Sequence, residues 1–77
     1  MKLPNIEWLI ENGGNVEVGH FDVLDLGEVA AVASDDNNML AALVRRDSES
    51  LDALLRRLDK AIDKALNDQE YIDEIND

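Results

Sequence analysis

The chain lacks cysteine altogether and has one histidine, one proline, one tryptophan, one tyrosine and one phenylalanine among its 77 residues. The absence of cysteine excludes disulfide bonds, thiolate zinc ligands and a thiol nucleophile. A single histidine without a nearby second ligand argues against a transition-metal site, so we expect no metal and no other cofactor. No apolar run approaches the roughly 18 residues of a membrane-spanning helix, and no signal-peptide segment follows the N-terminus. These absences predict a soluble, intracellular protein.

Positive charge is also scarce, because 7 Lys and Arg residues stand against 18 Asp and Glu residues and give a net charge of −11. A surface this negative repels nucleic acids and anionic membranes, so direct binding to either is not expected. High net charge favours disorder, but 45% of the residues are hydrophobic and fall in periodic runs. The sequence therefore predicts one small folded domain over residues 1–77, with a correspondingly small core.

The first part of the chain predicts a short helix followed by strands. Pro4 suits a first helical turn, and Ile6, Leu9 and Ile10 share one helical face. Gly13 suits the position after the last turn, so we expect a helix over about residues 4–12. Valine then alternates with polar residues, which predicts one bent strand or two short strands within residues 15–26.

Residues 28–46 fit two structures. The apolar runs 29–33 and 39–44 flank a polar segment whose Asp and Asn residues favour a turn, so a hairpin is the preferred interpretation. The alternative is a helix that begins near Asn37. Met39 and Leu43 also fit a helical spacing, and alanine favours helix over strand.

A long amphipathic helix is predicted next, with its start at Asp47 or Ser48. Its apolar positions are Leu51, Leu54, Leu55, Leu58, Ile62, Ala65 and Leu66. Its polar face includes Asp59 and Asp63 among several basic residues. We expect the apolar face, with Leu54, Leu55, Leu58 and Ile62 buried, to pack against the sheet.

The end of the chain has two interpretations. Asp68 is a candidate N-cap for a separate short helix within residues 68–77, and the alternative is a frayed tail. The predicted fold class is therefore α+β. It comprises a short N-terminal helix, a two- or three-stranded antiparallel sheet, and a long C-terminal amphipathic helix packed on the sheet.

Groups suited to catalysis are few and have no evident partners in the sequence. His20 lies two residues from Asp22, a spacing that a surface strand produces as readily as an active site does. Ser48 and Ser50 have no nearby histidine and fit a helix start. The segment 35–38 offers oxygen ligands for calcium, but its spacing does not match an EF-hand loop. We therefore expect neither enzymatic activity nor a metal site.

The distribution of charge is the most informative feature of the sequence. Residues 3–44 include eight acidic residues and no basic one, and residues 65–77 include five acidic residues and no basic one. Six of the seven cations lie within residues 45–64. The uncompensated carboxylates predict an acidic surface for a basic protein partner. The candidate partner-binding residues are Asp22, Asp25, Glu28, Asp35, Asp36, Glu70, Asp73 and Glu74.

The run from Met39 to Ile62, in which a strand leads into a helix through Glu49, Ser50 and Leu51, resembles small phage and prophage proteins. A small, acidic chain without cysteine is also similar to anti-CRISPR inhibitors. That resemblance implies a DNA mimic in the cytoplasm of a bacterial host cell. Such a protein binds the nucleic-acid-binding channel of a basic protein or ribonucleoprotein complex and competes with DNA or RNA.

A second resemblance, to the antitoxin domain of the HicB kind, is carried by a sheet followed by a helix. It implies an antitoxin-like subunit, and the alternative function is therefore a phage accessory or assembly protein or an antitoxin-like subunit. A protein of this kind self-associates through apolar faces, for example as a homodimer.

Overall fold

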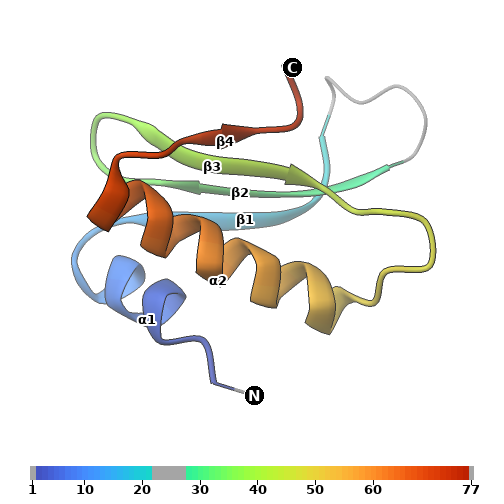
Figure 1. Ribbon diagram of the computed structural model, residues 1–77, viewed down its shortest axis with the longest axis horizontal. Helices are drawn as coiled ribbons and strands as arrows, with labels where there is room; N and C mark the ends of the chain where they lie inside the picture. Colours follow the sequence, from blue (N-terminus) through green and yellow to red (C-terminus); the bar gives the residue numbers. More distant parts are fainter. Residues whose placement is uncertain (1, 22–27, 77) are drawn as a thin grey trace.

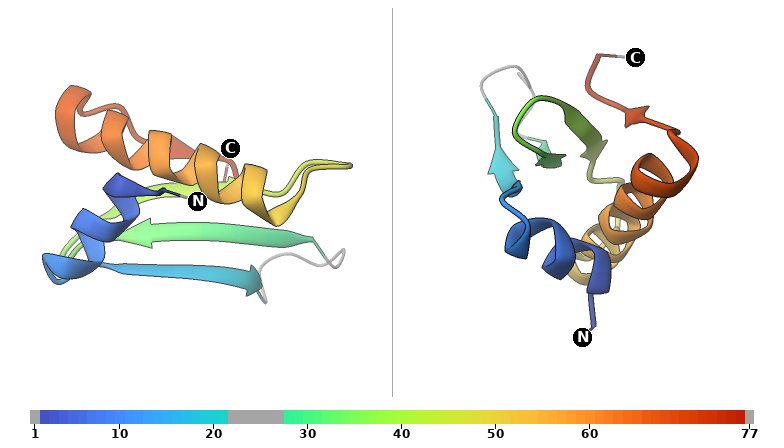
Figure 2. Two further views of the ribbon diagram at one scale, coloured as in Figure 1. Left: turned by 90° about the horizontal axis from the view of Figure 1, so that it is seen from below. Right: turned by 90° about the vertical axis from the view of Figure 1, so that its left-hand side faces the viewer.

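The computed structural model describes residues 2–21 and 28–76, and these form two helices and a four-stranded sheet (Figure 1). The elements are α1 (Pro4–Glu11), β1 (Asn15–His20), β2 (Val29–Ser34), β3 (Met39–Val44), α2 (Leu51–Asp68) and β4 (Ile72–Asp73). Both helices cover the same face of the sheet (Figure 2). The α+β class and the order of helix, sheet and long helix are confirmed. The sheet has four strands instead of two or three, and it is mixed instead of antiparallel because β4 pairs parallel with β3.

The strands follow the order β1-β2-β3-β4 across the sheet. β1 pairs antiparallel with β2 along its whole length, from Asn15 opposite Ser34 to His20 opposite Val29. The strand predicted within residues 15–26 is therefore confirmed as far as residue 20, while residues 22–27 lie outside the described part of the chain. α1 ends as predicted, because Gly13 has a φ of 90°, which glycine adopts without steric cost.

The β2–β3 hairpin is confirmed, and the helical alternative from residue 37 is wrong. The two strands pair antiparallel, with Ala31 opposite Leu43. Asp35 closes the turn, because its Oδ1 accepts hydrogen bonds from the backbone N–H groups of Asn37 (2.9 Å) and Asn38 (2.7 Å). Burial of the alanines between sheet and helix outweighs their intrinsic preference for helix.

The segment after α2 includes a strand, so the predicted short helix within residues 68–77 is wrong. Gln69, with a φ of 55°, ends α2 in a left-handed conformation. β4 then pairs parallel with β3, and the Glu74 N–H donates a hydrogen bond to the carbonyl of Ala42 at 2.7 Å. Ile72 packs against the core, which an isolated, strongly acidic helix would not achieve.

α2 begins later than the sequence predicts. Its N-cap is Ser50, whose Oγ accepts a hydrogen bond from a backbone N–H of the first turn at 3.1 Å. Asp47 and Ser48 lie in the preceding turn, where Ser48 has a φ of 64°. The carboxylate of Glu49 also stabilises this turn, because it accepts a hydrogen bond from the Arg46 N–H at 2.9 Å.

The N-terminus of α1 is capped by Asp59 of α2. Leu3 precedes α1 and its side chain makes no capping hydrogen bond. The Asp59 carboxylate accepts hydrogen bonds from the backbone N–H groups of Asn5 and Ile6, each at 2.9 Å, and from the Asn5 side chain at 3.0 Å. Asp59 is 8% exposed, so its expected place on a solvent-exposed polar face is wrong. The crossing of the two helices places this carboxylate where the α1 dipole favours an anion.

The core lies between the two helices and one face of the sheet. Its buried members are Ile6, Leu9, Ala31, Ala33, Leu40, Ala41, Leu43, Leu54, Leu58, Ala61, Ile62 and Ala65. The burial of Leu54, Leu58 and Ile62 is confirmed, whereas Leu55 is only half-buried. The alanines on β2 and β3 allow α2 to lie close to the sheet.

Neither of the described helices is both long and apolar enough to cross a membrane.

Candidate acidic interface

Glu49, Arg57 and Glu74 form a part-buried charge network where β3, α2 and β4 meet. The Arg57 guanidinium bonds to both carboxylate oxygens of Glu49 at 2.8 and 3.0 Å, and to Glu74 at 3.0 Å. It also donates to the Val44 carbonyl at 2.9 Å, while the second Glu74 oxygen accepts from the Val44 N–H at 2.9 Å. Only 21% of the Arg57 side chain and 9% of the Glu49 side chain are exposed. Both oxygens of the Glu74 carboxylate therefore accept hydrogen bonds within the protein.

Acid is expected to destabilise the protein through Glu49. Its hydrogen bonds from the Arg57 side chain and, secondarily, from the Arg46 backbone lower the pKa of this carboxyl from 4.5 to about 2. Because the folded-state pKa is the lower one, the carboxylate stabilises the fold fully above pH 4.5. That contribution is lost as the pH falls from 4.5 towards 2, and melting temperatures measured across this range should fall accordingly.

The Glu49→Gln variant separates this contribution from the general titration of carboxyl groups. It should melt at a lower temperature than wild type at neutral pH, and the difference should shrink as the pH approaches 2. The matched Glu17→Gln variant, at an exposed position on β1, should follow the wild-type profile. A constant difference between Glu49→Gln and wild type at every pH would contradict the role of this carboxylate.

Two of the predicted partner-binding residues close turns of the chain. Asp73 accepts hydrogen bonds from the backbone N–H groups of Ile75 and Asn76, each at 3.0 Å, and from the Asn76 side chain at 3.1 Å. The bonds from Asn76, first from its backbone, lower the pKa of Asp73. The backbone N–H of Asn37, with the next N–H along the chain, lowers the pKa of Asp35 in the same way. Both carboxyl groups therefore stay ionised to a lower pH than a free aspartate.

The structure does not bring all eight predicted partner-binding residues together. Asp22 and Asp25 lie outside the described residues. Glu74 belongs to the charge network and Asp73 to its own turn. Glu28 is exposed, but it precedes β2 and so lies at the end of the sheet away from the β2–β3 turn.

Three of the predicted residues, Asp35, Asp36 and Glu70, lie with Glu11 and Asp68 at one end of the molecule, a surface that we call the acidic end. The C-terminal ends of α1 and α2 and the β2–β3 turn all lie there, at the left in Figure 1 and in the left view of Figure 2. Neither helix has a basic residue in its last turn, so the carbonyl ends of two helix dipoles add to the negative field. Glu70 is 3.8 Å from Lys64, but both side chains are more than half exposed and such pairs contribute little.

The basic residues gather on a different surface. Arg46, Arg57, Lys60 and Lys64 line a groove of about 180 Å³ between α2 and β4, and Glu74 lies among them. These are four of the seven basic residues in the chain. Apart from Lys64, none of them forms an ion pair with a residue of the acidic end within the described part of the chain. The positive groove therefore leaves most of the field of the acidic end uncancelled.

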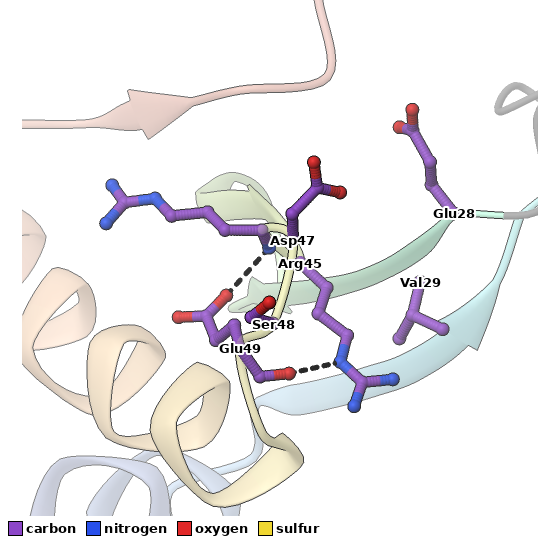
Figure 3. Close-up of a pocket in the computed structure, with 7 residues that line it drawn as sticks. Glu28, Val29, Arg45, Asp47, Ser48 and Glu49 are labelled. Atoms are coloured by element: carbon purple, nitrogen blue, oxygen red, sulfur yellow. Dashed lines mark hydrogen bonds between the residues drawn. The ribbon is translucent and has the colours of Figure 1, made fainter.

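A hollow of about 450 Å³ lies at the opposite end of the sheet, beside the loop between β3 and α2 (Figure 3). Its lining residues are Glu28, Val29, Arg45, Arg46, Asp47, Ser48 and Glu49. The Arg45 side chain donates to the Glu49 carbonyl at 2.7 Å and the Arg46 N–H donates to the Glu49 carboxylate at 2.9 Å, which holds the loop that leads into α2. The lining includes no histidine, so Ser48 has no imidazole base in this hollow.

Glu11 and Asp68 belong to the acidic end but are not among the residues predicted from the sequence. Both are the last residues of their helices, so the sequence held a signal, namely two helices whose last turn has no basic residue. Their position near the β2–β3 turn, which includes Asp36, could not be predicted without the topology of the fold. The topology places the C-terminal ends of both helices and this turn at the same end of the molecule.

The chemistry available at the acidic end is Coulombic attraction and hydrogen-bond acceptance by carboxylates. Among residues 2–21 and 28–76, no group of three or more histidine, aspartate or glutamate side chains is arranged to hold a metal ion. His20 is exposed, and Asp22, its suggested partner, lies outside the described residues. Comparison with protein-family models, curated proteins and solved structures finds no match to this chain.

Proposed function

We propose that this protein is a non-enzymatic binding module. Its acidic end contacts the basic, nucleic-acid-binding surface of a partner protein or ribonucleoprotein complex and competes there with DNA or RNA. The observation that carries the proposal is the gathering of five carboxylates and two helix C-termini at one end, apart from the groove that holds four of the seven cations. An uncancelled field of this kind steers an oppositely charged partner during association.

The charge density of the protein supports competition with a nucleic acid. A net charge of −11 along a longest dimension of 32 Å corresponds to one charge per 2.9 Å, from 32 divided by 11. Duplex DNA carries one charge per roughly 1.7 Å of helix axis. The two densities differ by less than a factor of about two, so a basic channel would attract both. In its narrower form, the proposal is a DNA mimic of the anti-CRISPR kind that acts in the bacterial cytoplasm.

Neutralising the acidic end should weaken partner binding at least about tenfold, mostly through a slower association rate. The test variant carries Glu11→Gln, Asp36→Asn, Asp68→Asn and Glu70→Gln, and it leaves Asp35 in place because that residue closes a turn. The protein is immobilised, exposed to a nuclease-treated bacterial lysate, and washed with duplex DNA. The proteins that the DNA displaces are quantified, because competition with nucleic acid is the property at issue.

The matched control carries Glu17→Gln, Glu28→Gln, Asp47→Asn and Asp52→Asn, four exposed residues outside the acidic end. Both variants lose four carboxylates and so change the net charge from −11 to −7. The control should retain the DNA-displaceable proteins that the acidic-end variant loses. Equal loss in the two variants would assign binding to net charge alone, and retention in both would remove the proposal.

Self-association is the second candidate function, and one feature favours it. Both helices cover one face of the sheet (Figure 2), while Val32 and Val44, which are half-buried, alternate to the other face beside Ala30 and Ala42, which are 0% exposed. An accessory or antitoxin-like protein would pair through the accessible part of this face, the side chains of Val32 and Val44. Salt separates the two functions, because a complex held by charge weakens as salt rises whereas an apolar dimer does not.

A further inference from the structure

A groove of about 430 Å³ lies between the two helices and is lined by Asn5 and Trp8 of α1 and by Leu66 and Asn67 of α2. We call it the Trp8 groove. Trp8 is 50% exposed and Leu66 is 38% exposed, so the indole ring and the leucine side chain are accessible. None of the four lining residues is charged, in a chain in which 32% of the residues are charged.

The two amide side chains of the groove have their NH₂ groups bonded internally. Asn5 Nδ2 donates to the Asp59 carboxylate at 3.0 Å, and Asn67 Nδ2 donates to the Asp63 carbonyl at 3.2 Å and to the Asp63 carboxylate. Oxygen atoms of carboxylates and carbonyls only accept, so these bonds fix which amide atom is the nitrogen. Among the hydrogen bonds of the described residues, neither amide oxygen accepts one. Neither oxygen therefore has an internal donor that a ligand would have to replace.

Carboxylates stand beside the groove on both helices. Glu11 follows Trp8 by three residues and Asp63 precedes Leu66 by three residues, a spacing that makes neighbours on a helix surface. Both carboxylates are exposed, and no basic residue lines the groove. Glu11 also belongs to the acidic end, so the groove adjoins that surface. The groove thus offers an aromatic face, two acceptor oxygens and a negative rim.

We infer that the Trp8 groove binds an arginine side chain of the basic partner. This inference rests on the proposed function and names the chemical group that the partner presents. A guanidinium is planar, always charged, carries five N–H donors and no acceptor, and stacks on an indole face. A lysine ammonium is a compact charge that the negative rim attracts, but it lacks the plane and the fixed fork of donors. The groove therefore distinguishes arginine from lysine, whereas the acidic end alone does not.

The experiment titrates the full chain with hexa-arginine and, separately, with hexa-lysine at one ionic strength. Trp8 is the sole tryptophan of the chain, so its fluorescence reports on the groove directly. Hexa-arginine should bind about fivefold more tightly than hexa-lysine, in line with a cation–π contact. It should also change the Trp8 emission, which hexa-lysine should leave nearly unchanged.

Two variants test whether the preference for hexa-arginine over hexa-lysine arises in the Trp8 groove, and a third variant is their control. Trp8→Leu keeps an apolar side chain without the aromatic face, and Asn67→Ala removes one acceptor oxygen while the fluorescent residue stays. Calorimetry should show the preference for hexa-arginine reduced to less than about twofold in Trp8→Leu and reduced in part in Asn67→Ala. Ile10→Ala changes a side chain on the same helix that is 53% exposed and outside the groove, and it should keep the full preference.

Each outcome decides between the two proposals. Equal binding of the two peptides, or a preference that survives in both Trp8→Leu and Asn67→Ala, overturns the arginine site and leaves the acidic-end function standing. An equal loss of preference in Ile10→Ala also overturns the site, because the effect would then belong to α1 as a whole. If neither peptide binds the wild-type chain, the proposed function and the arginine site both fail.

Discussion

Replacing Asp59 with alanine is expected to lower the free energy of unfolding by about 2–4 kcal/mol, which combines a lost helix cap with buried donors left unpaired. The Asp59 carboxylate accepts three hydrogen bonds from Asn5 and Ile6, and Asp59 is 8% exposed. Its removal leaves the first turn of α1 without an acceptor for two backbone N–H groups. For a domain of this size, each kcal/mol corresponds to about 4–8 °C in melting temperature.

Asp63→Ala is the matched control for this prediction. Asp63 lies one turn further along α2, is exposed, and bonds only to Asn67 of its own helix among the described residues. Its loss should change stability by no more than about 0.5 kcal/mol. Asp59→Asn keeps one acceptor oxygen and should fall between wild type and alanine. If Asp59→Ala and Asp63→Ala melt at the same temperature, the capping of α1 by α2 is not a major source of stability.

The parts of the fold that the sequence predicts are those that local patterns determine. The 3.6-residue period of leucines marks α2, and Gly13 marks the end of α1 because a left-handed residue is needed there. The polar segment after Ser34 marks a turn, since Asp35 can accept hydrogen bonds from N–H groups two and three residues along the chain. Each of these features involves residues close together in sequence.

The features that the sequence does not predict join residues far apart in the chain. Asp59 caps a helix that begins more than 50 residues earlier, and its place in a run of charged residues indicates only a solvated face. β4 is two residues long, so its alternation is too short to recognise, and its pairing with β3 depends on where α2 ends. The Val44 N–H donates a hydrogen bond to the Glu74 carboxylate, and the two residues are 30 positions apart, so no local sequence pattern indicates this contact.

The candidate site shows the same division. The lack of cations in residues 3–44 means that Asp36 and the other carboxylates of this segment have no basic neighbour within it. It did not indicate which carboxylates lie together on the surface. Glu74 and Asp73 accept hydrogen bonds within the protein. Glu11 and Asp68 lie at the same end because α1 and α2 both end there. Trp8 carried a sequence signal, since it lies off the apolar face of α1, but its groove requires the neighbouring α2.

Leu58→Ala is expected to have the largest effect on stability, about 2–5 kcal/mol, the cost of removing a fully buried leucine and leaving a cavity. Leu58 is 0% exposed and lies in the core between α2 and the sheet. The alanines that face it on β2 and β3 have no side-chain freedom with which to fill the space. The cavity should therefore stay open, which places the expected loss in the upper part of that range.

Leu51→Ala is the control that separates burial from helix periodicity. Leu51 precedes Leu58 by seven residues, so the two share one face of α2, yet Leu51 is 48% exposed. If burial decides the cost, Leu51→Ala should lose less than about 1 kcal/mol, because alanine is also the better helix former. Urea unfolding followed by circular dichroism measures both variants, and a Leu58→Ala chain that fails to fold beside a folded Leu51→Ala chain leads to the same conclusion. Equal losses in the two variants would mean that the apolar period of α2, and not its contact with the sheet, determines stability.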